Sequence, residues 1–228
     1  MIKIGFVGLS HLGLNYAVAS AVKGFKVVGY DEKLNLVNDL KNKKISFFEK
    51  NLEKNLVKNF SKLQFTNKIS DLKKCDIVFI SQDVPTNNRG ESNIEIIKNL
   101  ISKTSRVIKK KCILVIMCQV YPGFCRNIRW NKNQVYYQVE TLIFSQAQNR
   151  ALNPERIIVG KSKNRIDTNY LKYLKSFNCP ILQMSIESAE LTKIAINLYL
   201  VNSVTLTNIL SEVAENINGN WTLISKAL

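Results

Sequence analysis

The sequence contains one histidine, His11, among its 228 residues, and its five cysteines form no Cys-x-x-Cys pair. Zinc sites and disulfide frameworks are recognised by closely spaced cysteines and histidines, usually in even numbers. The sequence therefore predicts neither a metal site nor a disulfide framework. Cys75 and Cys112 border apolar, strand-like runs, which favours reduced and buried thiols at both positions.

The sequence also has no continuous apolar run that approaches the length of a membrane span. Its first residues lack the basic leader, apolar stretch and cleavage site of a secretory signal, and a strand is expected from the very start of the chain. We therefore expect a cytoplasmic protein with no membrane partner. Internal repeats and low-complexity segments are absent from the sequence as well.

Acidic residues are scarce: 17 Asp and Glu stand against 33 Lys and Arg, for a formal net charge of +16. Such an excess can indicate nucleic acid, an anionic membrane or phosphorylated small molecules as partners. The lysines are scattered along the chain, however, and do not alternate with aromatic residues as they do on surfaces that bind single strands. We favour a solvated basic face and rank nucleic acid last among the possible partners.

Strand and helix patterns alternate along the chain, which is typical of an α/β protein with a parallel sheet. The expected strands are residues 2–7, 25–30, 75–80, 111–117, 135–138, 156–159 and 181–184. The expected helical regions are residues 12–23, 34–60, 93–110 and 168–177, followed by one long helix over 185–216 without internal Gly or Pro. This order predicts a Rossmann-like, doubly wound, mainly parallel sheet followed by a long helix.

The stretch VGLSHLGL, residues 7–14, closely matches the dinucleotide-binding turn Gly-x-Gly-x-x-Gly. Gly8 and Gly13 occupy the first and third glycine positions, which permit the tight turn and the close approach of helix and strand. Ser10 replaces the second glycine; it is small, and its hydroxyl can donate to a phosphate. A pyrophosphate would lie at the N-terminus of the following helix, where free N–H groups and the helix dipole favour anions.

Asp31 ends the second expected strand, eighteen residues beyond Gly13, close to the spacing of about 20 for a carboxylate that binds the ribose. A carboxylate there accepts from ribose hydroxyls and repels a 2′-phosphate, which favours NAD over NADP. The loop of nucleoside triphosphatases, Gly-x-x-x-x-Gly-Lys-Ser/Thr, is absent from the sequence. The competing interpretation is a structural glycine turn in which Asp31 only caps the next helix.

A polar stripe runs along the long helix. At about 100° per residue, Glu190, Lys193 and Asn197 share one narrow sector, while most of the remaining circumference is apolar. A helix that is apolar nearly all round is expected to be buried, and buried charges must be paired or face a wet cleft. Two interpretations stay open: a Glu190–Lys193 pair with a locally bonded Asn197, or a lysine and an amide held to stabilise developing negative charge.

Together these residues resemble the UDP-glucose/GDP-mannose dehydrogenase family, from the first strand to the end of the chain. The opening GFVGLSHLGLNYAVASAVKGFKVVGYD is similar to its NAD-binding start, and CDIVFISQDVPT to its next cofactor-facing segment. CQVYPGF takes the place of the family's Ser-Thr-Val-Pro-Pro-Gly-Thr turn, and NPERIIVG resembles a family strand. SAELTKIAINLYLVNSVTLTNILSEVAE resembles the central helix through which the family dimerises.

The resemblance implies an NAD-binding domain over residues 1–184 and a helical dimerisation region over residues 185–228, hence a homodimer through the 185–216 helix. It implies a UDP- or GDP-linked sugar as substrate and a role in making polysaccharide precursors. Lys193 and Asn197 coincide with the helix lysine and asparagine that support the anionic intermediate at the sugar C6, and Glu140 with the first active-site glutamate. The implied cofactor contacts are Gly8, Ser10, His11, Leu12, Gly13, Asp31, Pro85, Thr86 and Gln119.

The chain also departs from the family pattern. Gln119 replaces the active-site threonine, Phe144 aligns with the second glutamate, and Asn87 replaces a proline. The family continues beyond the position of Leu228 with a segment that bears a nucleophilic cysteine and then a nucleotide-sugar domain. We expect a truncated nucleotide-sugar dehydrogenase that transfers hydride from a sugar hydroxyl to NAD, without a complete four-electron oxidation. The alternative is an NAD-binding or dimerisation module without turnover.

Overall fold

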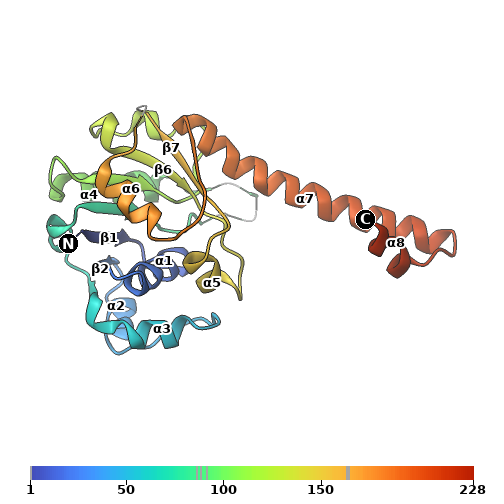
Figure 1. Ribbon diagram of the computed structural model, residues 1–228, viewed down its shortest axis with the longest axis horizontal. Coiled ribbons are helices and arrows are strands. Elements are labelled where there is room, and N and C mark those ends of the chain that lie inside the picture. Colours follow the sequence, from blue (N-terminus) through green and yellow to red (C-terminus); the bar gives the residue numbers. More distant parts are fainter. Residues whose placement is uncertain (1, 86, 88, 91, 163–164) are drawn as a thin grey trace. The chain divides into compact units, whose positions relative to one another are not determined.

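The computed structural model describes residues 2–85, 87, 89–90, 92–162 and 165–228. Across these residues eight strands form one sheet in the order β3-β2-β1-β4-β5-β6-β7-β8, and only the β6–β7 pair is antiparallel. Figure 1 labels β1, β2, β6 and β7 of this sheet. The strands are β1 Lys3–Val7, β2 Lys26–Tyr30, β3 Leu63–Thr66, β4 Ile77–Ile80, β5 Ile113–Ile116, β6 Val135–Val139, β7 Ile157–Lys161 and β8 Ile181–Met184. The predicted Rossmann-like, mainly parallel sheet is confirmed.

The place of β1 in the strand order determines where a ligand site is expected. β1 pairs in parallel with β2 on one side and with β4 on the other, so the chain reverses its direction of progress across the sheet beside β1. In doubly wound sheets the crevice at the carboxyl ends of the strands beside this switch point receives the ligand. The fully apolar sequences of β4 and β5 fit this central place, because helices or loops cover both faces of such strands.

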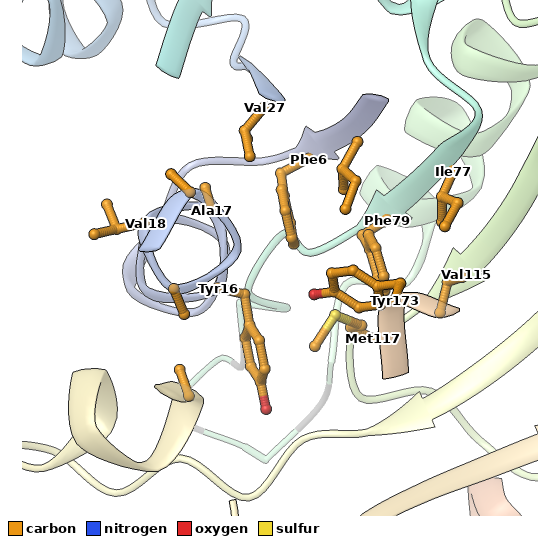
Figure 2. Close-up of a cluster of buried hydrophobic side chains, with 14 of the residues drawn as sticks. Phe6, Tyr16, Ala17, Val18, Val27, Ile77, Phe79, Val115, Met117 and Tyr173 are labelled. Atoms are coloured by element: carbon orange, nitrogen blue, oxygen red, sulfur yellow. The ribbon is translucent and has the colours of Figure 1, made fainter. Parts of the chain in front are cut away.

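Helices connect the strands within this sheet. They are α1 His11–Val22, α2 Leu34–Lys41, α3 Leu52–Lys58, α4 Glu95–Val107, α5 Ala147–Leu152 and α6 Thr168–Lys175, with short 3-10 turns η1 Phe60–Lys62, η2 Ile69–Lys74, η3 Cys125–Asn127 and η4 Lys132–Gln134. Aliphatic side chains and several aromatic rings fill the core between the sheet and these helices (Figure 2). The rings of Phe6 and Phe79 stack at 4.9 Å, and the ring of Tyr173 lies 5.2 Å from that of Phe79.

Two local predictions were wrong. The expected helical region over 34–60 is two short helices, α2 and α3, separated by an irregular segment in which Lys43 and Asn51 adopt positive φ angles. The edge strand β3 was missed, because it has only four residues and includes the exposed polar Gln64. Short edge strands with polar side chains give a weak period-two pattern.

The chain divides into two compact units: Met1–Glu190, which we call the sheet unit, and Leu191–Leu228, which we call the second unit. The sequence analysis placed the boundary between residues 184 and 185. The first turn of the helix α7, Ile186–Asn216, belongs to the sheet unit. Its Ile186 and Ala189 approach Gly160 of β7 so closely that a Cβ on this glycine would lie 2.8 Å from each. The second unit contains the rest of α7 and the short helix α8, Trp221–Ala227.

The long helix α7 contains a segment with the length and composition of a membrane span, so the expectation of no membrane partner stays a prediction. An 18-residue window within it reaches a mean hydropathy of 1.3 with at most two charged residues, so α7 is long and apolar enough to cross a membrane by length and composition alone. A search for uninterrupted apolar runs misses this window, because Asn, Ser and Thr are dispersed among its apolar residues. Within the second unit, apolar side chains such as Leu198, Tyr199, Val201 and Leu206 are exposed.

Candidate cofactor site

The turn between β1 and α1 requires glycine at two positions. Gly8 has φ +91°, and a Cβ there would lie 2.6 Å from Cα of Gln82 at the end of β4. Gly13 lies in the first turn of α1, where a Cβ would lie 1.8 Å from the carbonyl oxygen of Gly8 and 2.7 Å from Oγ of Ser81. Ser81 Oγ also donates to the Gly8 carbonyl at 3.0 Å, which fixes the turn against the neighbouring strand.

Ser10 precedes α1 with an extended backbone (φ −63°, ψ −171°), and its side chain makes no capping hydrogen bond to the helix. Instead its Oγ accepts from the backbone N–H of Asp83 at 3.2 Å, which leaves the hydroxyl hydrogen available to another acceptor. The first turn of α1 contains no acidic residue. Its N–H groups and the positive end of the helix dipole therefore form an arrangement suited to an anion.

Asp31 lies at the carboxyl end of β2 and is 7% exposed. Its Oδ2 accepts from the backbone N–H of Leu9 at 2.8 Å, and its Oδ1 accepts from the N–H of Lys33 at 2.9 Å. The carboxylate thus orders both the glycine turn and the start of α2, while each oxygen keeps a further lone pair. Both the ligand role and the capping role considered from the sequence are compatible with these contacts.

Two cavities lie beside this turn. One, of about 340 Å³, is lined by residues that include Leu9, Ser10, His11, Asp31 and Gln82. The other, of about 190 Å³, is lined by Leu12, Gln82, Asp83, Val84, Ser92, Cys118, Gln119 and Glu140. Gln82 lines both cavities, so they are neighbours at the carboxyl ends of the strands. An elongated ligand with an anionic centre fits this arrangement, because the N-terminus of α1 lies where the two cavities meet.

A buried glutamate that the sequence analysis missed connects the turn to a distant loop. Glu49, 5% exposed, contacts Nε2 of His11 at 2.8 Å and accepts the backbone N–H groups of Ser145 and Ala147 at 3.2 and 3.0 Å. The His11 ring also contacts the rings of Phe47 and Phe144, with centroids 5.1 and 4.6 Å away. Glu49 therefore holds the start of α1 and the loop after β6 together. Neither its spacing nor its neighbours in the sequence signal this role.

The remaining predicted residues of the sheet unit are distributed as follows. Glu140 follows β6, lines the smaller cavity with Gln119, and accepts the N–H of Leu142 at 3.0 Å through Oε2. Pro85 lies in the exposed loop after β4, and Thr86 lies outside the described residues. Phe144, at the position that aligns with a family glutamate, is 78% exposed.

The polar stripe divides between the two units. Glu190, completely buried, accepts the backbone N–H groups of Gly123 and Cys125 at 2.5 and 2.8 Å and so fixes the turn after β5. Lys193 and Asn197 belong to the second unit and lie one helical turn apart on the same side of α7. Their catalytic roles stay predictions.

The thiols of the sheet unit are poorly suited to nucleophilic attack. Burial raises the pKa of Cys118, which lines the smaller cavity, to about 12. Burial and the neighbouring Glu190 carboxylate raise the pKa of Cys125 further. A thiol must ionise to attack, so both are unreactive near neutral pH. Among the described residues, no group of three or more His, Cys, Asp or Glu side chains is placed to hold a metal ion.

Comparison with known proteins identifies the fold and the cofactor. The UDP-glucose/GDP-mannose dehydrogenase family, NAD binding domain, matches residues 2–177. The chain belongs to this family. Its sheet unit is the family's NAD-binding domain, and its cofactor is accordingly NAD.

Relatives and solved structures of this dehydrogenase family match nearly the whole chain. UDP-glucose 6-dehydrogenase of Rickettsia typhi is 26% identical over 96% of this chain and 53% of its own length. UDP-glucose 6-dehydrogenase TuaD of Bacillus subtilis is 25% identical over 96% and 50%. The fold matches GDP-mannose dehydrogenase of Pseudomonas aeruginosa with a TM-score of 0.92, at 19% identity over 99% of this chain and 56% of that chain. The chain therefore spans about half the length of the relatives it matches.

Proposed function

We propose that this chain is the NAD-binding part and central helix of a nucleotide-sugar dehydrogenase, which transfers hydride from a sugar hydroxyl carbon to NAD. The observation that carries the proposal is the pair of adjoining cavities around the N-terminus of α1, with Asp31 at one and Gln119 and Glu140 at the other. Both relatives named above are UDP-glucose dehydrogenases, which supports a UDP-linked sugar as a candidate substrate. A GDP-linked sugar is the other candidate.

We assign the two ends of NAD to the two cavities. Asp31 accepts from the ribose hydroxyls of the adenosine part, and the N–H groups of Leu12 and Gly13 with the Ser10 hydroxyl donate to the pyrophosphate. His11 is held beside this turn by Glu49. Gln119 and Glu140 are assigned to the nicotinamide end, with Pro85 contributing from the loop after β4. The cofactor contact of Thr86 stays a prediction. NAD supplies the hydride acceptor when bound.

The proposed catalytic roles follow from the negative charge that develops on the sugar oxygen during hydride transfer. Removing hydride from a carbinol carbon requires that the hydroxyl proton leave, so negative charge develops on the oxygen. The Lys193 ammonium and the Asn197 amide donate hydrogen bonds to that oxygen and stabilise its charge. Glu140 accepts the proton, directly or through one water molecule. The second oxidation is not expected from this chain alone, because Phe144 cannot take a proton from water.

We propose a homodimer through α7. The exposed apolar side chains of its second half form the kind of surface that soluble monomers rarely leave uncovered. A second copy is favoured over a lipid bilayer, because the same stretch carries Asn202, Asn208 and Glu212, which are costly in hydrocarbon. Sedimentation should give a dimer, and Leu206→Glu should shift it to monomer; a stable wild-type monomer at high micromolar concentration contradicts the dimer.

A cytoplasmic location and a role in polysaccharide precursor synthesis complete the proposal, with nucleic acid ranked last as a partner. The test is NADH formation by purified chain with NAD and a panel of UDP- and GDP-sugars, compared with Lys193→Ala. Turnover that Lys193→Ala abolishes without loss of NAD binding supports the dehydrogenase. NAD binding without turnover on any sugar favours the module without turnover.

A further inference from the structure

The connection between β5 and β6 leaves a groove on the sheet unit. These parallel neighbours require a crossover, which is usually an α-helix. Here residues 117–134 contain only the 3-10 turns η3 and η4. A cavity of about 550 Å³ lies between this crossover and α4, and we call it the α4 groove. The lining residues that matter below are Lys98, Ser105, Arg106, Tyr121, Arg129 and Trp130.

The α4 groove is cationic. No Asp or Glu is among its lining residues, and within the described part of the chain neither Arg106 nor Arg129 has a carboxylate within 4.0 Å. An adjoining cavity of about 650 Å³ shares Arg129 and Trp130 with the groove and adds Lys110 and Lys132. Lys98 is paired with Glu95 at 2.6 Å, so the uncompensated cations of the lining are Arg106 and Arg129. Such cations on a concave surface focus a positive potential there, so the groove favours an anionic ligand.

The α4 groove also has a fixed aromatic wall. The indole N–H of Trp130 donates to the carbonyl oxygen of Cys112 at 3.0 Å, which anchors the ring between the two cavities. Tyr121, 48% exposed, contributes a second aromatic ring to the lining. In addition, Ser105 Oγ is buried and has no hydrogen-bond partner among the described residues. The groove therefore offers a planar stacking surface and cations within one cavity, whereas the buried Ser105 hydroxyl is not exposed to a ligand there.

We propose that the α4 groove binds a nucleoside phosphate, with the base against Trp130 and the phosphate on Arg106 and Arg129. Arginine suits this ligand because its planar fork donates two parallel hydrogen bonds to phosphate. The cavity volume falls in the range of about 300–1,000 Å³ typical of small-molecule sites, which favours one nucleotide over a nucleic-acid strand. The groove shares no lining residue with the two cavities assigned to NAD, so this inference does not rest on the proposed function.

Tryptophan fluorescence provides the test, because the chain has only two tryptophans, Trp130 and Trp221. In a Trp221→Phe background, titration with UMP should quench Trp130 saturably at millimolar concentration or below. The double variant Arg106→Ala/Arg129→Ala should weaken UMP binding by at least about tenfold, since each arginine contributes a charged hydrogen bond. The matched control Lys73→Ala/Lys74→Ala removes two charges from exposed positions of η2 and should bind UMP as the parent does.

Three further probes define the ligand class. Uridine and inorganic phosphate should each bind much more weakly than UMP, since each satisfies only one half of the groove. The inference is overturned if UMP causes no saturable quenching, or if both double variants lose UMP binding equally. Equal affinity for inorganic phosphate and UMP contradicts a nucleotide site, and a strong preference for oligouridylate over UMP identifies a nucleic-acid surface instead.

Discussion

Gly13→Ala should destabilise the chain by distorting the contact between the glycine turn and α1. The added Cβ would lie 1.8 Å from the Gly8 carbonyl oxygen and 2.7 Å from Ser81 Oγ. The helix must retreat, at the cost of about 1–3 kcal/mol typical of overpacking. Loss of the bond from Ser81 to Gly8 adds about 1 kcal/mol, and the better helix propensity of alanine returns up to about 1 kcal/mol. The last two contributions nearly cancel, and the 1.8 Å contact places the overpacking cost in the upper part of its range, so the net expectation is a loss of about 2–3 kcal/mol.

Substitutions at two other glycines, Gly24 and Gly8, distinguish the cost of a steric clash from the cost of a positive φ angle. Gly24 also has a positive φ, +96°, but a Cβ added there would meet no atom within 4 Å beyond its chain neighbours, so Gly24→Ala should cost only about 1–2 kcal/mol. Gly8 combines a positive φ with a Cβ contact of 2.6 Å to Gln82, so Gly8→Ala should cost at least as much as Gly13→Ala. The expected order of destabilisation is therefore Gly24, then Gly13, then Gly8.

The assay is denaturant unfolding followed by circular dichroism, with NAD affinity measured by calorimetry on the same variants. A loss of about 2–3 kcal/mol corresponds to a fall in Tm of roughly 4–12 °C for a chain of this size. Folded Gly13→Ala should also bind NAD more weakly, because its helix N-terminus has moved from the phosphate position. Unfolding of Gly13→Ala at the wild-type midpoint, or greater damage from Gly24→Ala, would refute this reasoning.

Three further outcomes are expected. Glu49→Ala should lower the free energy of unfolding by about 3 kcal/mol, because it leaves two buried N–H groups and an imidazole without their acceptor. Glu49→Gln should lower it less, and denaturant midpoints measure both effects. Cys112 and Cys118, with pKa values raised to about 12 by burial, should resist alkylation at pH 8, where the half-buried Cys179 reacts first in mass spectra. Because unfolded thiols ionise near their usual pKa of 9.0, the contribution of these two thiols to the free energy of unfolding should be constant below pH 9 and should fall as pH rises toward 12. Because Phe144 cannot take a proton from water, product analysis with UDP- and GDP-sugars should detect no uronic acid and no formation of two NADH per sugar.

Local patterns were sufficient to predict a doubly wound, mainly parallel sheet, without its edge strand β3. β4 and β5 are continuous apolar runs, and β1 is apolar after Lys3, as expected of parallel strands covered on both faces. The glycine spacing and Asp31 directed attention to the turn, because the residues that shape it lie close together in the sequence. Packing explains Gly8 and Gly13 in atomic detail, since both face backbone or side-chain atoms of neighbouring elements.

Contacts between distant segments were beyond prediction from one sequence. Glu49 joins His11 to Ala147 across 38 and 98 residues, within a segment that the periodicity presented as helix. Glu190 was interpreted as part of a helical stripe, yet it accepts two N–H groups of a turn more than sixty residues earlier. The α4 groove likewise depends on the absence of a crossover helix between β5 and β6 in the described chain, which composition does not reveal.

Calorimetric titration of the chain with NAD and with NADP tests the central claim most directly. We predict that NAD binds, that NADP binds at least about tenfold more weakly because its 2′-phosphate meets the Asp31 carboxylate, and that Asp31→Asn narrows this difference. Asparagine preserves the size of the side chain and one acceptor oxygen, so the turn should remain folded. Absence of NAD binding to the folded chain, or equal affinity for NAD and NADP, would contradict the account.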